Sequence, residues 1–245
     1  MPVEHKSGCL VCGKPLHYFQ AQRELPCAYC GQRFLAGASC EAGHYVCDGC
    51  HGKKGVEAAL SCFQTTGSKD PVAILERVMG NRFIYMHGPE HHILVGGALL
   101  AAYHNAGGAL DRAEALAEMA RRGGEAPGGA CGFWGCCGAA ISAGMYLSIA
   151  LGATPLSNES WGLCNRLTAA CLSAIGGLGG PRCCKRNAFT AARVAAAFTR
   201  EHLGVAMELP ETIRCGFFPQ NRECLGARCP YNPAARLNAE GAPGK

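Results

Sequence analysis

Apolar residues recur at helical spacing along most of the chain after its first quarter. Ile74, Leu75 and Val78, for example, share one helical face behind Asp70-Pro71, a favourable helix start. The same periodicity predicts further helices over residues 93–102, 111–123, 136–151 and 187–202. We therefore expect a mainly α fold in which residues 63–245 form an α-helical domain rich in cysteine and glycine.

Residues 1–62 lack this pattern and contain too few aliphatic residues to fold by core burial alone. They carry instead C-x2-C, a second C-x2-C and then C-x3-H-x2-C-x2-C, a spacing typical of structural zinc. Metal binding would supply the folding free energy of this segment. We expect a small zinc-binding module of zinc-ribbon or RING-like type. Its two zinc ions would be held by Cys9, Cys12, Cys27, Cys30, Cys40, His44, Cys47 and Cys50.

The spacing of these ligands allows two pairings. A sequential pairing joins the first pair to the second and the third to the fourth, whereas a cross-braced pairing joins alternate pairs. Residues 27–50 resemble the first six ligands of a RING-type domain, which favours the cross-brace. The last RING ligand pair is absent, so a ubiquitin-ligase role does not follow. Residues 47–51 also match the c-type haem motif C-x-x-C-H, but both cysteines are already zinc-ligand candidates.

Composition narrows the function classes. The chain has 18 cysteines among 245 residues, and its start, MPVEHKSGCLVCG, lacks the apolar run of a secretory signal. We therefore expect a cytoplasmic protein whose cysteines serve metal or redox chemistry and not disulfides. The net charge of +5 is too small and too scattered to indicate nucleic-acid binding.

Residues 126–158 contain no charged side chain, which raises the question of a membrane span. The segment is rich in Gly, Ala, Ser and Cys, and Thr154-Pro155 interrupts it. A closely packed buried helix explains this composition better than a bilayer span does, so we expect no membrane contact.

A histidine-rich turn precedes the apolar helix over residues 93–102. His87, Glu90, His91 and His92 lie within six residues of one another. A helix N-terminus favours anions and lowers the pKa of nearby imidazoles, which suits general acid–base catalysis or the binding of a metal or carboxylate. These four residues are therefore candidate catalytic residues. A capped helix start with surface histidines is the alternative.

Ten of the cysteines lie in the second half of the chain, and five of these flank predicted helices. Cys131, Cys136 and Cys137 sit in a glycine-rich lead-in and are candidates to hold a cofactor. Cys183 and Cys184 open the helix at 187–202. Nearby cations and a helix N-terminus favour the thiolate form of such cysteines.

Three cations flank that vicinal pair. Cys183, Cys184 and Lys185 are therefore candidate catalytic residues, while Arg182 and Arg186 are candidates to bind an anionic substrate. Buried packing is the alternative for any free cysteine. It is the simpler interpretation for three others, Cys62, Cys164 and Cys171.

Cys215, Cys224 and Cys229 close the series of cysteines, and Pro230 follows the last of them. A terminal Cys-Pro is common in iron–sulfur ligand runs. Three cysteines would leave one iron of a 4Fe–4S cluster open as a Lewis acid, or a cysteine of the glycine-rich region would complete the set. A third zinc site, closed by one more thiolate, is the alternative.

Four motifs together resemble an uncharacterised family: HGPEHH at residue 87, GACGFWGCCG at residue 129, GGPRCCKR at residue 179 and the closing cysteines. This family is a domain of unknown function of anaerobic bacteria and archaea, often encoded near radical-SAM or methyltransferase-like proteins. The resemblance covers nearly the whole chain but implies no established reaction. A weaker similarity to the family named for split-Soret cytochromes, and to iron–sulfur serine dehydratases and cysteine desulfidases, carries over no catalytic residue.

Two hypotheses of different classes follow. The first is an iron–sulfur enzyme of anaerobic metabolism that acts on a small anionic thiol or hydroxy compound, by elimination (a lyase) or sulfur transfer. The second is a non-enzymatic metal or cluster carrier that docks to a redox, radical-SAM or methyltransferase partner. An enzyme requires a closed pocket that joins the histidine turn to Cys183/Cys184, whereas a carrier requires exposed cysteines.

Overall fold

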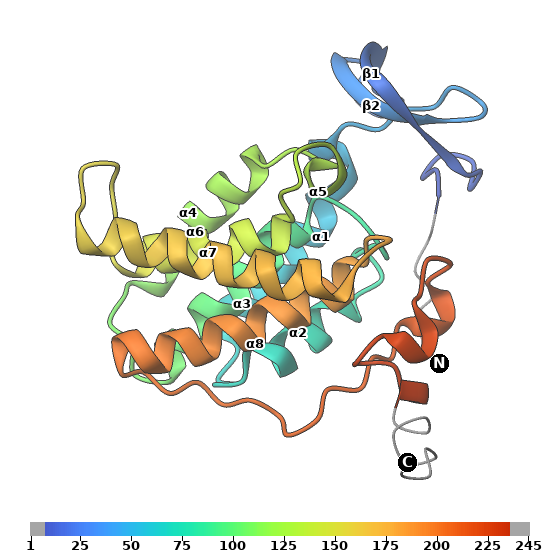
Figure 1. Ribbon diagram of the computed structural model, residues 1–245. Coiled ribbons are helices and arrows are strands. Elements are labelled where there is room, and N and C mark those ends of the chain that lie inside the picture. Colours follow the sequence, from blue (N-terminus) through green and yellow to red (C-terminus); the bar gives the residue numbers. More distant parts are fainter. Residues whose placement is uncertain (1–7, 236–245) are drawn as a thin grey trace.

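The computed structural model describes residues 8–235, which form a small β-hairpin attached to a body of helices (Figure 1). The expected mainly α fold with a small cysteine-bearing N-terminal part is confirmed. The helices are α1 (Asp48–Thr65), α2 (Pro71–Met79), α3 (His91–Asn105), α4 (Arg112–Glu125), α5 (Ala130–Phe133), α6 (Gly138–Ala150), α7 (Glu159–Leu178) and α8 (Cys184–Leu203).

Helix α3 lies at the centre of the helical body and packs against α1, α2, α4, α6 and α8. It is apolar on every side, as expected for a helix surrounded by others, and its residues from Ile93 to Ala102 are all buried. Gly96 and Gly97 let its neighbours approach closely, because a Cβ on Gly97 would lie 2.4 Å from the Phe63 ring. The small residues of this region therefore serve helix packing.

Helix boundaries agree with the local signals in the sequence. The Asp70 side chain accepts hydrogen bonds from the N–H groups of Val72 and Ala73 and so caps α2. The buried helix expected over 136–151 is α6, and the last long helix, expected over 187–202, begins three residues earlier at Cys184. None of the described helices combines the length and apolar character that crossing a bilayer requires.

The strands β1 (Leu16–Pro26) and β2 (Arg33–Cys40) form an antiparallel hairpin with an irregularity between Tyr18 and Arg23. Sequence reasoning did not predict this hairpin. Most β1 side chains are exposed, so β1 lacks the alternation of apolar and polar residues that marks a half-buried strand. Its ends are fixed instead by the loops that carry the zinc-ligand cysteines.

Helix α1 connects the hairpin part to the helical body. Its first turn contains Cys50 and is capped by the Cys47 side chain, whereas Phe63 near its end is fully buried in the helical core. The expected division at residues 62 and 63 falls inside this helix, and the two domains remain a prediction. After α8, residues 204–235 run back along the body with two short 3-10 turns, η1 (Phe218–Gln220) and η2 (Gly226–Arg228).

Candidate functional site

The N-terminal cysteines gather into two compact groups. In each group the four ligand atoms lie within 4.8 Å of one another, which fits a tetrahedral shell around one metal ion. One group joins the first ligand pair to the third, and the other joins the second to the fourth, so the structure has the cross-braced pairing. The two groups are Cys9, Cys12, Cys40 and His44, and Cys27, Cys30, Cys47 and Cys50.

Backbone N–H groups point at sulfur atoms in both groups. Burial alone would raise the pKa of the Cys27 thiol, but the N–H groups of Cys30, Cys47 and Tyr29 outweigh it and lower the pKa to about 6. The Cys50 pKa is raised to about 12, first by its contact with Cys47. Only some of the thiols therefore ionise on their own, and a bound cation would stabilise the remaining thiolates.

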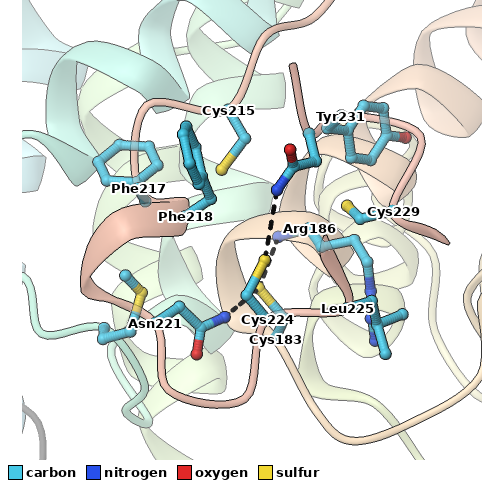
Figure 2. Close-up of a pocket in the computed structure, with 12 residues that line it drawn as sticks. Cys183, Arg186, Cys215, Phe217, Phe218, Asn221, Cys224, Leu225, Cys229 and Tyr231 are labelled. Atoms are coloured by element: carbon cyan, nitrogen blue, oxygen red, sulfur yellow. Dashed lines mark hydrogen bonds between the residues drawn. The ribbon is translucent and has the colours of Figure 1, made fainter. Parts of the chain in front are cut away.

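A third group of four cysteines surrounds a small cavity at the C-terminal side of the body (Figure 2). Cys183 caps the start of α8, and the other three come from the closing segment, so distant parts of the chain meet here. Apolar residues, among them Phe217 and Leu225, complete the lining. The four cysteines are Cys183, Cys215, Cys224 and Cys229.

Polar hydrogens are directed at the sulfur atoms of this group. Asn221 Nδ2 donates to Cys183 Sγ at 3.4 Å, and Asn232 Nδ2 lies 3.6 Å from Cys224 Sγ (Figure 2). The backbone N–H groups of Arg186 and Gly226 donate to the same two sulfur atoms, each at 3.4 Å. Hydrogen bonds to sulfur are among the features that tune metal-bound thiolates.

The charge balance of this cavity also favours a cation. Burial raises the pKa of Cys215 to about 11, the backbone N–H of Phe217 partly offsets this, and the three neighbouring thiols raise it further. Burial also raises the pKa of Cys183, so these two thiols stay protonated unless positive charge enters the cavity. A metal centre would provide that charge.

A second, much larger cavity separates the hairpin from the helical body. This cleft has a volume of about 810 Å³ and is lined by the hairpin, the 87–92 turn, the loop at 127–137 and the start of α8. Four cysteines line it, Cys9 of the N-terminal groups together with Cys131, Cys137 and Cys184, whereas Cys136 does not. The histidine turn and the vicinal cysteine pair therefore meet, with Cys184 on the cleft and Cys183 on the four-cysteine cavity.

The histidines of the turn occupy different places. His92 lines the cleft, and its Nδ1 donates to the Ala126 carbonyl at 2.9 Å, which leaves Nε2 unprotonated when the ring is neutral. His87 also lines the cleft, and its Nε2 lies 2.9 Å from Glu223 Oε2. His91 is buried away from the cleft, and burial, with the nearby Lys185, lowers its pKa well below the usual value.

Glu90 is buried beside His91 and joins the two parts of the protein. Its Oε1 accepts a hydrogen bond from the Tyr85 N–H at 3.1 Å, and its Oε2 lies 3.3 Å from Nδ1 of His51, a residue of α1. The residue after the last zinc-ligand cysteine thus contacts the histidine turn. This contact joins the N-terminal part of the chain to the helical body.

The three cations of the GGPRCCKR motif also differ in their surroundings. Lys185 is fully buried, donates to the Tyr85 carbonyl at 3.0 Å, and has its pKa lowered to about 8 by burial. Arg186 Nη2 donates to the carbonyls of Gly179 and Pro181, so part of its hydrogen-bonding capacity is already used. Arg182 lies on the cleft with its guanidinium over the Tyr18 ring, 5.2 Å from the centroid.

Several residues of these sites escaped sequence reasoning. Tyr18 from the hairpin and Phe133 from α5 are neighbours on the cleft, with ring centroids 6.2 Å apart. Asn221 reaches both Cys183 and His87 and so connects the two cavities. The only local signal for Asn221 is its place between two closing cysteines, and Tyr18 has none. Cys171 is fully buried and Cys164 is partly buried against the core, as expected for packing cysteines.

Comparison with known proteins gives one match. No curated protein and no solved structure matches the chain. A model of a family of unknown function, DUF5714, matches residues 60–232 and so spans the helical body and the closing cysteines. This agrees with the expectation of an uncharacterised family. Since the match covers most of its length, the chain belongs to the DUF5714 family of unknown function.

Proposed function

We propose that this protein is an iron–sulfur protein with a substrate cleft, in which Cys183, Cys215, Cys224 and Cys229 hold one cluster. The observation that carries this proposal is the convergence of four thiols from two distant segments on one small cavity. The N-terminal groups would hold two zinc ions, which stabilise the module that forms the outer wall of the cleft.

The four thiols do not form a group as compact as a single zinc ion requires, and the cavity among them, about 10 Å³, would widen to hold a cluster. Zinc–sulfur bonds of about 2.3 Å bring the sulfur atoms of one tetrahedral site within about 4 Å of one another. Among residues 8–235, the groups that meet such a distance limit are the two N-terminal ones, and the C-terminal four are not among them. A cluster of several irons separates its cysteine ligands more widely, and four cysteines complete its ligand shell.

This ligand set changes the chemistry expected from the sequence. A cluster with four cysteine ligands supplies electrons and leaves no iron open as a Lewis acid. The acid–base step would then fall to His92, which lines the cleft and whose Nδ1 donates to the Ala126 carbonyl, so that Nε2 would exchange the proton. Arg182 would bind the anionic group of the substrate, a thiol or hydroxy compound, and Cys184 would be the thiol used in sulfur transfer.

The arrangement supports an enzyme over a carrier. The histidine turn and Cys184 line one cleft, as a shared site requires. Cys183 and Cys229 are buried and the other two cysteines of the cavity are partly buried, so the cluster would not lie open to a receiving partner. A carrier hypothesis would need these thiols at the surface.

Anaerobic reconstitution of the full chain with zinc, ferrous iron and sulfide tests the proposal. We expect about two zinc ions per chain and one iron–sulfur cluster, seen as iron, sulfide and visible absorbance. Cys215→Ser should lose most of the iron and keep the zinc. Cys164→Ser, which alters a cysteine outside both cavities, is the matched control and should keep both.

Two results would contradict the proposal. A chain that binds zinc but no iron would remove the iron–sulfur interpretation altogether. Equal iron content in the Cys215 and Cys164 variants would show that the cluster lies elsewhere. Because circular dichroism of the same samples reports the helical body, failure of the variant to fold is recognised separately.

A further inference from the structure

The cleft is larger than a small thiol or hydroxy acid needs. Its volume of about 810 Å³ falls in the upper part of the range of about 300–1,000 Å³ found for sites that take drug-sized ligands. Besides the 87–92 turn, three parts of the chain that are distant in sequence line it: the hairpin, the loop before α6, and the segment from the end of α7 to the start of α8. The occupant must therefore be long enough to contact all three.

Part of the cleft surface is formed by glycines and so carries no side chains. A Cβ placed on any of five glycines that line the cleft would meet no other heavy atom within 4 Å. The space in front of them is thus not filled by other side chains, and their backbone is accessible to a ligand. These glycines are Gly132, Gly135, Gly176, Gly179 and Gly180.

The same parts of the chain, together with the hairpin, also bring flat groups and one cation to the cleft. The rings of Tyr18 and Phe133 are each about half exposed, and their planes are tilted by 52°. The Arg182 guanidinium lies over the Tyr18 ring, and among the described residues no carboxylate pairs with it. Aromatic faces favour planar ligands, and an arginine without an ion pair favours a carboxylate, sulfonate or phosphate.

We propose that the cleft binds a flat organic anion of nucleotide size, with its planar part against Tyr18 and Phe133 and its acidic group on Arg182. This proposal depends on the proposed function in one respect, that the cleft is the substrate site. The sequence led us to expect a small anion, whereas the cleft favours a larger, partly apolar one. The acidic group would then lie in the cleft that Cys131 and Cys184 also line.

The test uses two probes that differ in one charge. The first is 1-anilinonaphthalene-8-sulfonate, a planar sulfonate, and the second is N-phenyl-1-naphthylamine, the same rings without the sulfonate. Fluorescence and calorimetric titration of the zinc-loaded full chain should give one saturable site for the sulfonate. Arg182→Gln should weaken sulfonate binding at least tenfold and change binding of the neutral probe less than twofold.

A pair of glycine variants locates the site. Gly176→Leu places a side chain into the cleft and should weaken binding of both probes at least tenfold. Gly177→Leu is the matched control, because this neighbour on α7 also has open space around its Cβ but does not line the cleft. Both variants add a better helix former, so circular dichroism and thermal unfolding should show them equally folded.

Three outcomes would overturn the inference: no saturable binding of the sulfonate, equal binding by the two glycine variants, or an equal effect of Arg182→Gln on both probes. Binding is measured without iron, and repeated with Cys224→Ser. Failure of cluster assembly therefore leaves this result intact, and failure of probe binding leaves the cluster proposal intact.

Discussion

Two adjacent cysteines belong to different sites. Cys183 caps α8 and lines the four-cysteine cavity, whereas Cys184 lies in the first turn and faces the cleft. Consecutive side chains around a helix start point about 100° apart, so neighbours in sequence need not share a site. The vicinal pair therefore connects the proposed cluster to the cleft and is not one functional unit.

This difference gives a prediction at the residue scale. Cys183→Ser should abolish iron incorporation during anaerobic reconstitution, because one of four ligands is lost. Cys184→Ser should retain the iron, since this thiol is not among those of the four-cysteine cavity. Iron and sulfide analysis of both proteins, with zinc as internal reference, measures the effect. Equal loss in both variants would show that the pair acts together.

At the scale of elements, the central helix α3 depends on glycines that the sequence alone presents as helix-weakening residues. Gly97 contacts the Phe63 ring of α1 where no Cβ fits. Gly124, in the exposed part of α4, has open space around it. Replacing glycine by alanine should therefore destabilise α3 and stabilise α4.

We expect Gly97→Ala to lower the free energy of unfolding by about 1–3 kcal/mol, the usual range for overpacking a core. Gly124→Ala should raise it by up to about 1 kcal/mol, because alanine is the better helix former. Urea unfolding followed by circular dichroism measures both. Stabilisation by Gly97→Ala would mean that α1 and α3 are not packed this closely.

At the scale of the whole molecule, the hairpin part and the helical body have different sources of stability. Among described residues 8–47, the buried apolar residues are Ala36 and four cysteines, whereas α3 alone buries an almost continuous apolar surface. We therefore expect metal binding to hold the hairpin, whereas core burial holds the helices. The hairpin forms a wall of the cleft. Loss of metal should therefore disrupt the cleft at conditions under which the helical core stays folded.

Removal of zinc with a chelator tests this order. Hydrogen exchange should show loss of protection over residues 16–40 and retained protection in α3, α6 and α8. Binding of the aromatic sulfonate should be lost in the same samples, because one wall of its site is gone. A helical body that loses protection together with the hairpin would show that metal also holds the core.

Several features followed from local sequence because their causes are local. The spacing of the zinc-ligand candidates indicates which cysteines group together as a possible metal site, and Asp70 defines the start of α2 by capping its own neighbours. The continuous apolar run of α3 indicates a buried helix by itself. The hairpin escaped prediction because a metal-held strand needs no alternating buried face.

Which residues come together in each cavity depends on packing between segments that are distant in sequence. The sequence left open which cysteine joins Cys215, Cys224 and Cys229, and α8 brings Cys183 to them. It gave no reason to connect Tyr18 with Arg182, which meet only because α1 sets the hairpin against the body. The kind of metal ligand and the start of a helix are set by residues that are close together in the sequence. Which residues face one another across a cavity is decided by how the helices pack.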